Sequence, residues 1–245
     1  MNFEEYGREN ERIIVMLHGA YYVHSFSKQY ALSDRFRIIV PHIMGYGKEA
    51  CRVFEADKCT EELAEFIGSL GKKVLLVGFS LGAQLAVKLL AEHAELFCGA
   101  VVISPWLIKE QPFLGEVLAQ NEKQYALFQK RWLCIFVGLM NGFNKQQRRE
   151  FVEQTAQVKI ETVRNMVDNG ICLDTIGGFE NAHLPIAALA GGKEQSVVCD
   201  SVKALARLNP NCTFEIWEKA AHNIPPMFSR QLNELIVRMA ENCFE

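Results

Sequence analysis

A serine flanked by two glycines, at the junction of a strand pattern and a helix pattern, constrains the fold of this chain more than any other feature. Residues 74–77 form an apolar run, residues 81–94 have helical spacing, and Gly-Phe-Ser-Leu-Gly at 78–82 joins them. A sharp turn from strand to helix forces Ser80 into strained backbone geometry and requires small residues two positions away on either side. The pattern therefore predicts a serine hydroxyl presented at the carboxyl end of a strand.

Strand and helix patterns alternate through the first hundred residues and again near the end of the chain. Strands are expected at residues 3–6, 13–17, 36–40, 74–77, 100–103, 185–190 and 213–217, and helices at 25–32, 60–70, 81–94, 201–208 and 229–242. Continuous apolar strands in this alternation are typical of a parallel sheet covered by helices on both faces. We therefore expect an α/β fold with a mostly parallel sheet of about seven or eight strands.

The alternation stops between residues 107 and 182. Only helical patterns are found there, at residues 116–139, 146–157 and 160–169. We expect a core made of residues 1–106 and 183–245, with residues 107–182 inserted as a helical cap. Most of the large apolar side chains of this insertion should pack against the core, whereas Phe128 and Trp132 are expected to face the site.

A serine hydroxyl is a weak nucleophile without a general base, and the base needs an acid that orients it. The chain order expected after such a turn is serine, acid, histidine. His222 follows the last predicted strand and is the expected base. Glu194 is the first carboxylate after the strand at 185–190 and is the expected acid, while Asp200, near the start of the next helix, stays open as an alternative.

Acyl transfer also needs N–H donors for the oxyanion that develops during the reaction. The amide of Leu81, directly after the serine, is one candidate, and the amide of Ala20, in the loop after the strand at 13–17, is the other. Three further residues at strand ends are expected to contact the substrate, namely Tyr21, Tyr22 and Trp106.

Composition and charge bear on the partners of this chain. The sequence is 49% hydrophobic and 22% charged, with a formal net charge of −3, and it has no long basic run. We therefore expect no nucleic-acid partner, and we interpret the basic cluster at 145–149 as a solvated helix face. No apolar stretch reaches the roughly 18 residues of a membrane span, so no membrane partner is expected.

The cysteines and the amino terminus suggest where the protein resides. None of the eight cysteines forms a C-x-x-C pair, so no metal site is expected. Cys98 and Cys134 lie in apolar patterns typical of free core cysteines. The first residues are acidic and lack the apolar region of a signal peptide. These features favour a reduced, cytoplasmic protein that uses no metal or organic cofactor.

Taken together, these residues resemble the α/β-hydrolase family. The resemblance rests on Leu-His-Gly at 17–19, Pro-x-x-x-Gly-x-Gly at 41–47, the serine turn at 78–82, a Gly-x-x-acid loop ending at Glu194, and His222. It implies an eight-stranded, mostly parallel sheet with a cap inserted after the sixth strand, although only about seven strands are visible here. The sequence departs from the commonest family pattern at three positions, with Glu194 for Asp, His42 for Asp and Ala221 for Gly.

The residues and the resemblance predict a serine hydrolase that acts on a small-molecule substrate, a small to medium apolar acyl or aryl ester, through an acyl-enzyme. Two alternatives remain. One is other chemistry on the same fold, by a carbon–carbon bond hydrolase, a lactonase or a lyase like the menaquinone-pathway synthase. The other is a ligand-binding receptor with weak catalysis. A buried arginine among the cap's basic residues, Lys130, Arg131 and Arg164, would favour a carboxylate-bearing substrate. Monomer and homodimer both remain open.

Overall fold

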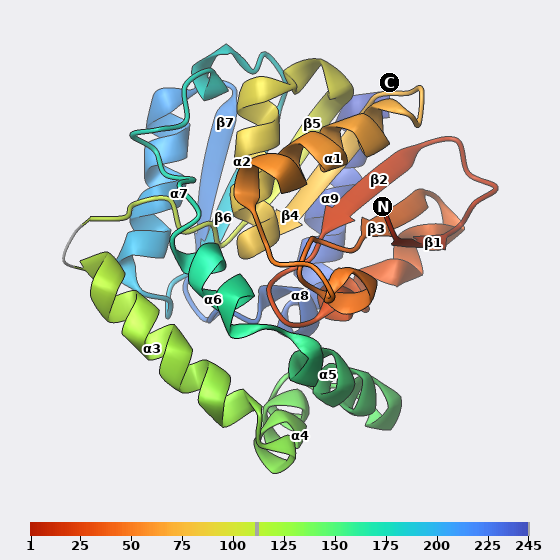
Figure 1. Cartoon of the computed structure of the whole chain (residues 1–245). Coiled ribbons are helices and arrows are strands. Elements are labelled where there is room, and N and C mark those ends of the chain that lie inside the picture. The colour runs from red at the N-terminus through yellow and green to blue at the C-terminus, as the bar shows by residue number, and fades with distance from the viewer. Residues whose placement is uncertain (111–112, 245) are drawn as a thin grey trace.

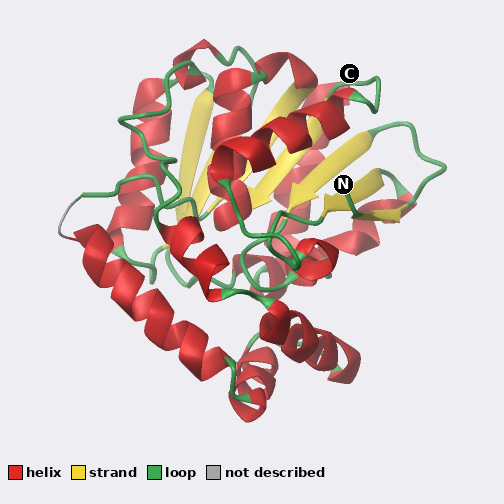
Figure 2. Ribbon diagram, viewed as in Figure 1, coloured by secondary structure: helices red, strands yellow, loops and turns green. Residues whose placement is uncertain are grey.

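One sheet runs through the molecule, and all but one of its pairings are parallel. The computed structural model describes residues 1–110 and 113–244, and the strands of this part of the chain have the order β1-β3-β2-β4-β5-β6-β7 (Figures 1 and 2). β1 pairs with β3 in antiparallel orientation, and every other pairing is parallel. The strands are β1 (Phe3–Tyr6), β2 (Ile13–Leu17), β3 (Arg37–Pro41), β4 (Val74–Phe79), β5 (Phe97–Ile103), β6 (Ile186–Gly191) and β7 (Cys212–Trp217). The predicted α/β fold is confirmed.

Helices cover both faces of the sheet because successive side chains of a strand point to opposite faces. In β2, Val15 belongs to one buried cluster, and its neighbours Ile14 and Met16 belong to another. The first cluster is completed by α1 (Ala56–Gly68), α2 (Leu81–Glu92) and α7 (Ser196–Leu208). The second is completed by α9 (Ser229–Phe244). Figure 1 shows α1 and α2 in front of the sheet and α9 behind it.

Among the described residues, four α-helices lie between β5 and β6, within the segment expected to form an insertion. They are the α-helices α3 (Phe113–Phe128), α4 (Arg131–Met140), α5 (Lys145–Gln157) and α6 (Ile160–Val167), and a short 3-10 helix, η5 (Phe179–Asn181), follows them before β6. The pattern at residues 116–139 therefore corresponds to two helices rather than one. In Figure 1 these helices lie below the sheet, on the side toward which the parallel strands point.

The segment expected to be helical at residues 25–32 is helical, but not as one α-helix. This segment forms two short 3-10 helices, η1 (Val23–Phe26) and η2 (Gln29–Asp34). Phe26 and Leu32 are buried in the cluster that α9 completes. A 3-10 helix completes a turn in three residues. Each short 3-10 helix can therefore place an apolar side chain, Phe26 or Leu32, in the core.

The expectation of a free cysteine at position 98 is wrong. Cys98 in β5 forms a disulfide with Cys243 in α9, although Cys134 is free and buried as expected. Cys98 lies just before the strand expected at residues 100–103, and only the packing of α9 against β5 brings Cys243 to it. Disulfides are rare in the reducing cytosol. The cysteines therefore no longer support a cytoplasmic location.

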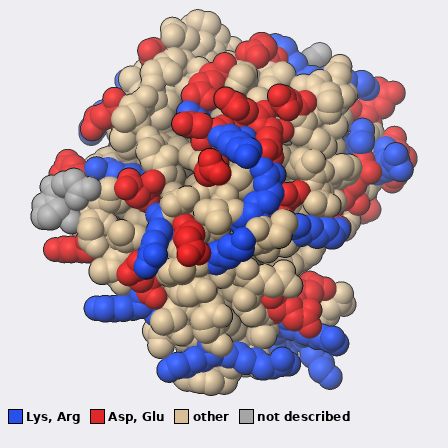
Figure 3. All heavy atoms as spheres, in the orientation of Figure 1, with Lys and Arg blue, Asp and Glu red and all other residues tan. Residues whose placement is uncertain are grey.

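The basic cluster at residues 145–149 opens α5. Its Arg149 is exposed and forms an ion pair with Glu153 one helical turn later, at 2.9 Å. Over the upper part of the face shown in Figure 3, basic and acidic side chains lie interspersed. The cluster therefore has the helical, solvated character expected of it.

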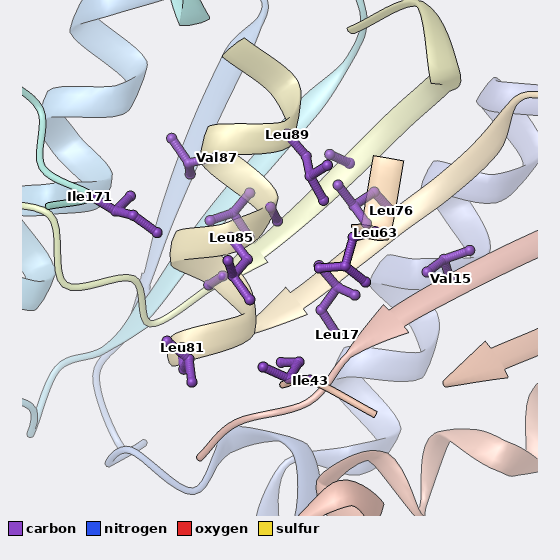
Figure 4. Close-up of a cluster of buried hydrophobic side chains, with 14 of the residues drawn as sticks. Val15, Leu17, Ile43, Leu63, Leu76, Leu81, Leu85, Val87, Leu89 and Ile171 are labelled. Carbon is purple, nitrogen blue, oxygen red and sulfur yellow. The ribbon is translucent and has the colours of Figure 1, made fainter. Parts of the chain in front are cut away.

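Helix α2 forms the centre of the larger buried cluster. Nine of its residues are buried, because the helix packs on β4 and also contacts α1 and the short 3-10 helix η5 (Phe179–Asn181). Figure 4 shows Leu81, Leu85 and Leu89 of α2 among side chains of β2, β4 and α1. Each fully buried leucine stabilises the fold by about 1.5–3 kcal/mol. The first turn of α2, which directly follows Ser80, is therefore rigidly held.

Candidate active site

Ser80 occupies the strained turn that the sequence predicts. It lies between β4 and α2 with φ 55° and ψ −115°, a conformation that side-chain-bearing residues rarely adopt. A Cβ added at Gly78 would overlap the carbonyl of Gly82, and one added at Gly82 would overlap the carbonyl of Leu17. Both glycines are therefore required by close approach of the backbone. The turn is pressed against the end of β2.

The position of the turn within the sheet is that of a ligand site in open α/β folds. From β2 the chain runs first to β3 on one side and then to β4 on the other, so the strand order reverses between β2 and β4. A crevice opens beyond the carboxyl ends of strands at such a switch point. In the β2–β4 register Leu17 pairs with Gly78, so the loop after β2 lies beside Ser80.

Three side chains from three different strand ends form a continuous hydrogen-bonded chain. Nε2 of His222 lies 2.9 Å from Oγ of Ser80, and Nδ1 of His222 lies 2.6 Å from Oε2 of Glu194. His222 is in the loop between β7 and α8 (Ile224–Met227), and Glu194 follows β6. With its proton on Nδ1, the imidazole donates to Glu194 and accepts from the serine hydroxyl. This is the geometry of a nucleophile, a base and an orienting acid.

Glu194 is held by donors on both of its oxygens. Its side chain is only 2% exposed, and Oε1 accepts hydrogen bonds from Oγ of Ser104 at 2.6 Å and from the amide of Gly191 at 2.7 Å. Burial raises the pKa of this carboxyl, but the hydrogen bond and charge of His222, with the bonds from Ser104 and Gly191, outweigh it and leave the pKa lowered. The alternative acid, Asp200, pairs with Lys203 on α7 instead.

Ser104 is a residue of the site that the sequence does not reveal. It directly follows β5, has φ 53°, and donates its backbone N–H to the carbonyl of Leu189 in β6. A serine after a strand is common, and nothing in the sequence states which carboxylate it meets. The one available signal is that the carboxyl ends of adjacent parallel strands, here β5 and β6, lie side by side.

The two amides expected to bind an oxyanion border the candidate site. Neither Leu81 nor Ala20 donates its amide to another backbone group within the described part of the chain. A Cβ at Gly19, next to Ala20, would lie 3.6 Å from Cβ of Ser80, so this loop approaches the nucleophile closely. The following residue, Tyr21, has φ 69° and turns the chain away. Both amides are therefore available beside the serine.

The buried ring of His18 braces the same loop. Its Nδ1 lies 2.7 Å from the carbonyl of Gly19, and its Nε2 accepts the amide of Ile43 at 3.0 Å. Burial lowers the pKa of His18 to about 3, so the ring is neutral at pH 7. A neutral ring with its proton on Nδ1 satisfies both contacts and fixes the loop after β2.

Two cavities meet at His222, and Ala221 also borders both. One, of about 440 Å³, we call the Trp106 cavity; its lining includes Ser80, Gln84, Trp106, Asn121 and Lys193. The other, of about 390 Å³, we call the aromatic cavity; its lining includes Tyr21, Tyr22, Phe128, Phe143 and Phe151. Both volumes lie in the range of small-molecule pockets. The imidazole therefore lies between a cavity with several polar side chains and a largely aromatic one.

The residues expected to contact substrate are only partly brought together. Trp106 lines the first cavity, and Tyr21, Tyr22 and Phe128 line the second. Trp132 lines neither, and 66% of its surface is exposed on α4, so it is dropped from the proposed site. Its apolar character suggested a contact with substrate, but its face of α4 points away from the core.

None of the three basic residues singled out in the sequence between β5 and β6 is buried at the site. Arg164 is exposed and pairs with Glu122 at 2.6 Å, while Lys130 and Arg131 are exposed. The condition that would favour a carboxylate-bearing substrate is therefore not met by these three residues. Within residues 1–110 and 113–244, no group of three or more His, Cys, Asp or Glu side chains is arranged to hold a metal ion.

Comparison with known proteins agrees with this architecture. A model described as the alpha/beta hydrolase family matches residues 14–235. No curated protein matches the chain by sequence.

Several solved structures are similar in fold. MenH from S. aureus has a TM-score of 0.77 and 16% identity, covering 100% of this chain and 98% of its own. A thermophilic esterase from Thermogutta terrifontis has a TM-score of 0.74 and 17% identity, covering 100% and 94%. The enol-lactonase from Burkholderia xenovorans LB400 has a TM-score of 0.78 and 14% identity, covering 98% and 96%. At these identities the likeness concerns the fold alone.

Proposed function

This chain belongs to the alpha/beta hydrolase family, and on that premise we propose that it is a serine hydrolase that cleaves a carboxylic ester through an acyl-enzyme. The observation that carries the proposal is the chain of hydrogen bonds from Glu194 through His222 to Ser80, with distances of 2.6 and 2.9 Å. A hydroxyl, an imidazole and a buried carboxylate in this order are the groups that acyl transfer requires.

The proposed reaction has two halves. In the first, Oγ of Ser80 attacks the acyl carbonyl while Nε2 of His222 takes the hydroxyl proton. The amides of Leu81 and Ala20 bind the oxyanion of the tetrahedral intermediate. Collapse of the intermediate expels the alcohol, which receives the proton from Nε2. In the second half, water gives a proton to Nε2 and attacks the acyl-enzyme, and Ser80 regains its proton as the acid leaves.

Glu194 acts throughout as an ionised partner of the imidazole. Its lowered pKa keeps it a carboxylate at neutral pH, so it stabilises the imidazolium that forms in each half-reaction. Its hydrogen bonds to Ser104 and Gly191 hold it against rotation. The longer side chain of Glu, compared with the Asp usual in this family, therefore does not prevent the contact with His222.

The two cavities support an ester with an apolar acyl or aryl group of small to medium size. The aromatic cavity suits the apolar group, and the Trp106 cavity suits the other part of the ester. The hydroxyl of Tyr21 and the indole N–H of Trp106 are buried and have no hydrogen-bond partner in the described part of the chain. Because an unpaired buried donor is unfavourable, each can favour a substrate with an acceptor at that point.

A probe and a substrate panel test the proposal. A fluorophosphonate should label the wild-type protein and the control Ser69→Ala, whose serine bonds only to its own helix. Ser80→Ala should not be labelled and should lose hydrolysis of p-nitrophenyl acetate, butyrate, octanoate and benzoate. Persistent labelling of Ser80→Ala would overturn the assignment of the nucleophile.

The same panel separates the alternatives. Labelling of Ser80 without turnover of any ester or lactone would favour a reaction other than ester hydrolysis. A compound that binds tightly, raises the melting temperature and is turned over negligibly would point to a ligand-binding receptor. Turnover that prefers apolar acyl or aryl groups would support the proposed substrate class.

A further inference from the structure

Helix α4 carries a continuous apolar face that is turned to solvent. Its exposed residues recur at helical spacing, with exposed fractions of 66% for Trp132, 36% for Ile135, 55% for Phe136, 54% for Leu139 and 63% for Met140. The opposite side of the helix is buried through Cys134 and Gly138. Single exposed apolar residues are common on proteins, but five on one face of a short helix mark an interaction surface.

The segment that carries this face is basic. From Gln124 to Arg149 the sequence contains five Lys or Arg residues and no Asp or Glu, although the whole chain has a net charge of −3. Of these cations, Lys130, Arg131 and Lys145 are exposed and have no ion-pair partner within the described residues. Figure 3 shows Lys and Arg along the lower edge of the molecule, where Figure 1 has α4 and α5.

The apolar face adjoins the aromatic cavity. Phe128 lies just before α4, and Asn141 and Phe143 lie just after it; all three line that cavity. Whatever docks on α4 therefore lies next to the cavity proposed for the apolar part of the substrate.

We propose that α4 docks the protein on an anionic lipid–water interface. Trp132, Phe136 and Met140 would enter the boundary between headgroups and acyl chains, while the flanking cations contact anionic headgroups. The helix, about 15 Å long, would lie in the plane of the interface. No described helix has the length and apolarity to cross a bilayer. This proposal departs from the sequence-based expectation of no membrane partner; that expectation was based on the absence of a spanning segment, and docking on an interface needs none.

A second copy of the chain fits this surface less well than a lipid interface does. In a twofold dimer the same patch meets itself, so the unpaired cations around one α4 would approach those around the other. Five residues also fall well short of the roughly 20–30 residues a side of a stable protein interface. An anionic interface, by contrast, complements both the apolar face and its basic border.

Vesicle binding tests the proposal without any substrate. Wild type should sediment with vesicles of phosphatidylcholine containing phosphatidylglycerol and should bind pure phosphatidylcholine at least tenfold more weakly. Trp132, the most exposed of the three tryptophans, should shift its emission to shorter wavelength on binding. Rising salt should weaken binding, because ions screen the headgroup attraction.

Two variants separate the apolar and the electrostatic contributions. Trp132→Ser/Phe136→Ser should lower binding at least tenfold, and Lys130→Glu/Arg131→Glu should do so too, because each basic residue near an anionic surface contributes about a fivefold factor. Phe214→Ser, which removes an aromatic side chain that is 46% exposed on β7, is the matched control and should bind like wild type. Unchanged melting temperatures establish that the variants fold.

Three outcomes would overturn the proposal. They are no binding of wild type to anionic vesicles at low salt, equal binding of Trp132→Ser/Phe136→Ser, and a dimer in solution that dissociates in that variant. The last result would assign the face to a second copy. The binding assay can be run with Ser80→Ala, so a failure of lipid binding and a failure of the proposed hydrolase are read separately.

Discussion

Three residues other than glycine have positive φ in the described part of the chain, and all three border the candidate site. They are Tyr21, Ser80 and Ser104. Such conformations require about 1–3 kcal/mol each and persist only where the surrounding structure enforces them. Ser80 and Ser104 directly follow β4 and β5, and Tyr21 lies in the loop after β2. All three strand ends meet at the candidate site. Among the described residues, these strained positions thus lie at or next to the groups that the proposed chemistry uses.

Ser104 is predicted to be a positioning residue for Glu194. Ser104→Ala should lower kcat about tenfold with little change in KM, because the hydroxyl touches the carboxylate and not the substrate. Ser104→Gly relieves the positive φ but also lacks the hydroxyl, so it should lose a similar factor. Ester-hydrolysis kinetics of both variants check this. Wild-type kcat in the glycine variant would show that the serine matters only through its backbone.

The lowered pKa of Glu194 predicts a pH-dependent contribution to stability. A carboxyl whose folded-state pKa lies below its unfolded value of 4.5 stabilises the fold above that pH and loses this effect as pH falls through the lowered pKa. The difference in free energy of unfolding between wild type and Glu194→Gln should therefore be largest above pH 4.5 and shrink as the pH falls below that value. Urea unfolding across this range measures it. A difference that grows on acidification would contradict the assigned direction.

At the scale of elements, the junction of β4 with α2 links packing to chemistry. The buried length of α2 holds its first turn in place, and the two glycines of the turn let it press against the end of β2. The loop after β2 thereby lies next to Ser80. A single steric condition, the absence of side chains at two positions, thus brings together the nucleophile and both proposed oxyanion amides.

Gly82→Ala is predicted to disrupt this junction. Its Cβ would overlap the carbonyl of Leu17, which is backbone and has little room to move. The free energy of unfolding should fall by about 2 kcal/mol or more, with loss of fluorophosphonate labelling. Gly115→Ala in α3 is the matched control, because no described atom beyond its chain neighbours and its own helix backbone lies within 4 Å of the added Cβ. Replacing this helical glycine should stabilise by up to about 1 kcal/mol. Equal effects of the two substitutions on stability would refute the steric argument.

At the scale of the whole molecule, a covalent bond connects the last helix to a strand inside the sheet. The Cys98–Cys243 disulfide spans a sequence separation of 145 residues and fastens α9 to β5. Cys98 lies near the amino end of β5, whereas the candidate site lies at the carboxyl ends of β4, β6 and β7. The bond therefore acts on the stability of the core, and the site depends on it only through that core.

Loss of the disulfide is predicted to lower stability while the site stays intact. Cys98→Ser should reduce the free energy of unfolding by about 2–4 kcal/mol, because the open chain gains conformational freedom when unfolded. A reductant should destabilise wild type and leave Cys98→Ser unchanged. Cys199→Ser, at a free cysteine, is the control. Thermal unfolding with and without reductant measures this, and equal melting temperatures for wild type and Cys98→Ser would contradict it.

Much of the fold and the order of the proposed catalytic residues could be predicted from sequence because both depend on short-range rules. Apolar periodicity marks β2, β4 and α2, and steric demand marks the glycines beside Ser80. The positions of the expected acid and base after their strands identify Glu194 and His222, and the structure places His222 beside Ser80 and Glu194 beside His222. The segment at residues 25–32 is helical as expected, but its division into two 3-10 helices could not be predicted, because three-residue and four-residue spacing differ little over so short a segment.

By itself, the sequence determined the alternation of strands and helices, the strained turn at Ser80, and the chain positions of Glu194 and His222. These follow from local periodicity and from the space that each residue needs. Only the tertiary structure decided that Ser104 holds Glu194, that Cys98 meets Cys243, that two cavities meet at His222, and that Trp132 faces solvent. The physical reason is that each of these depends on how elements distant in the chain dock, and docking distance and angle leave no mark on local spacing.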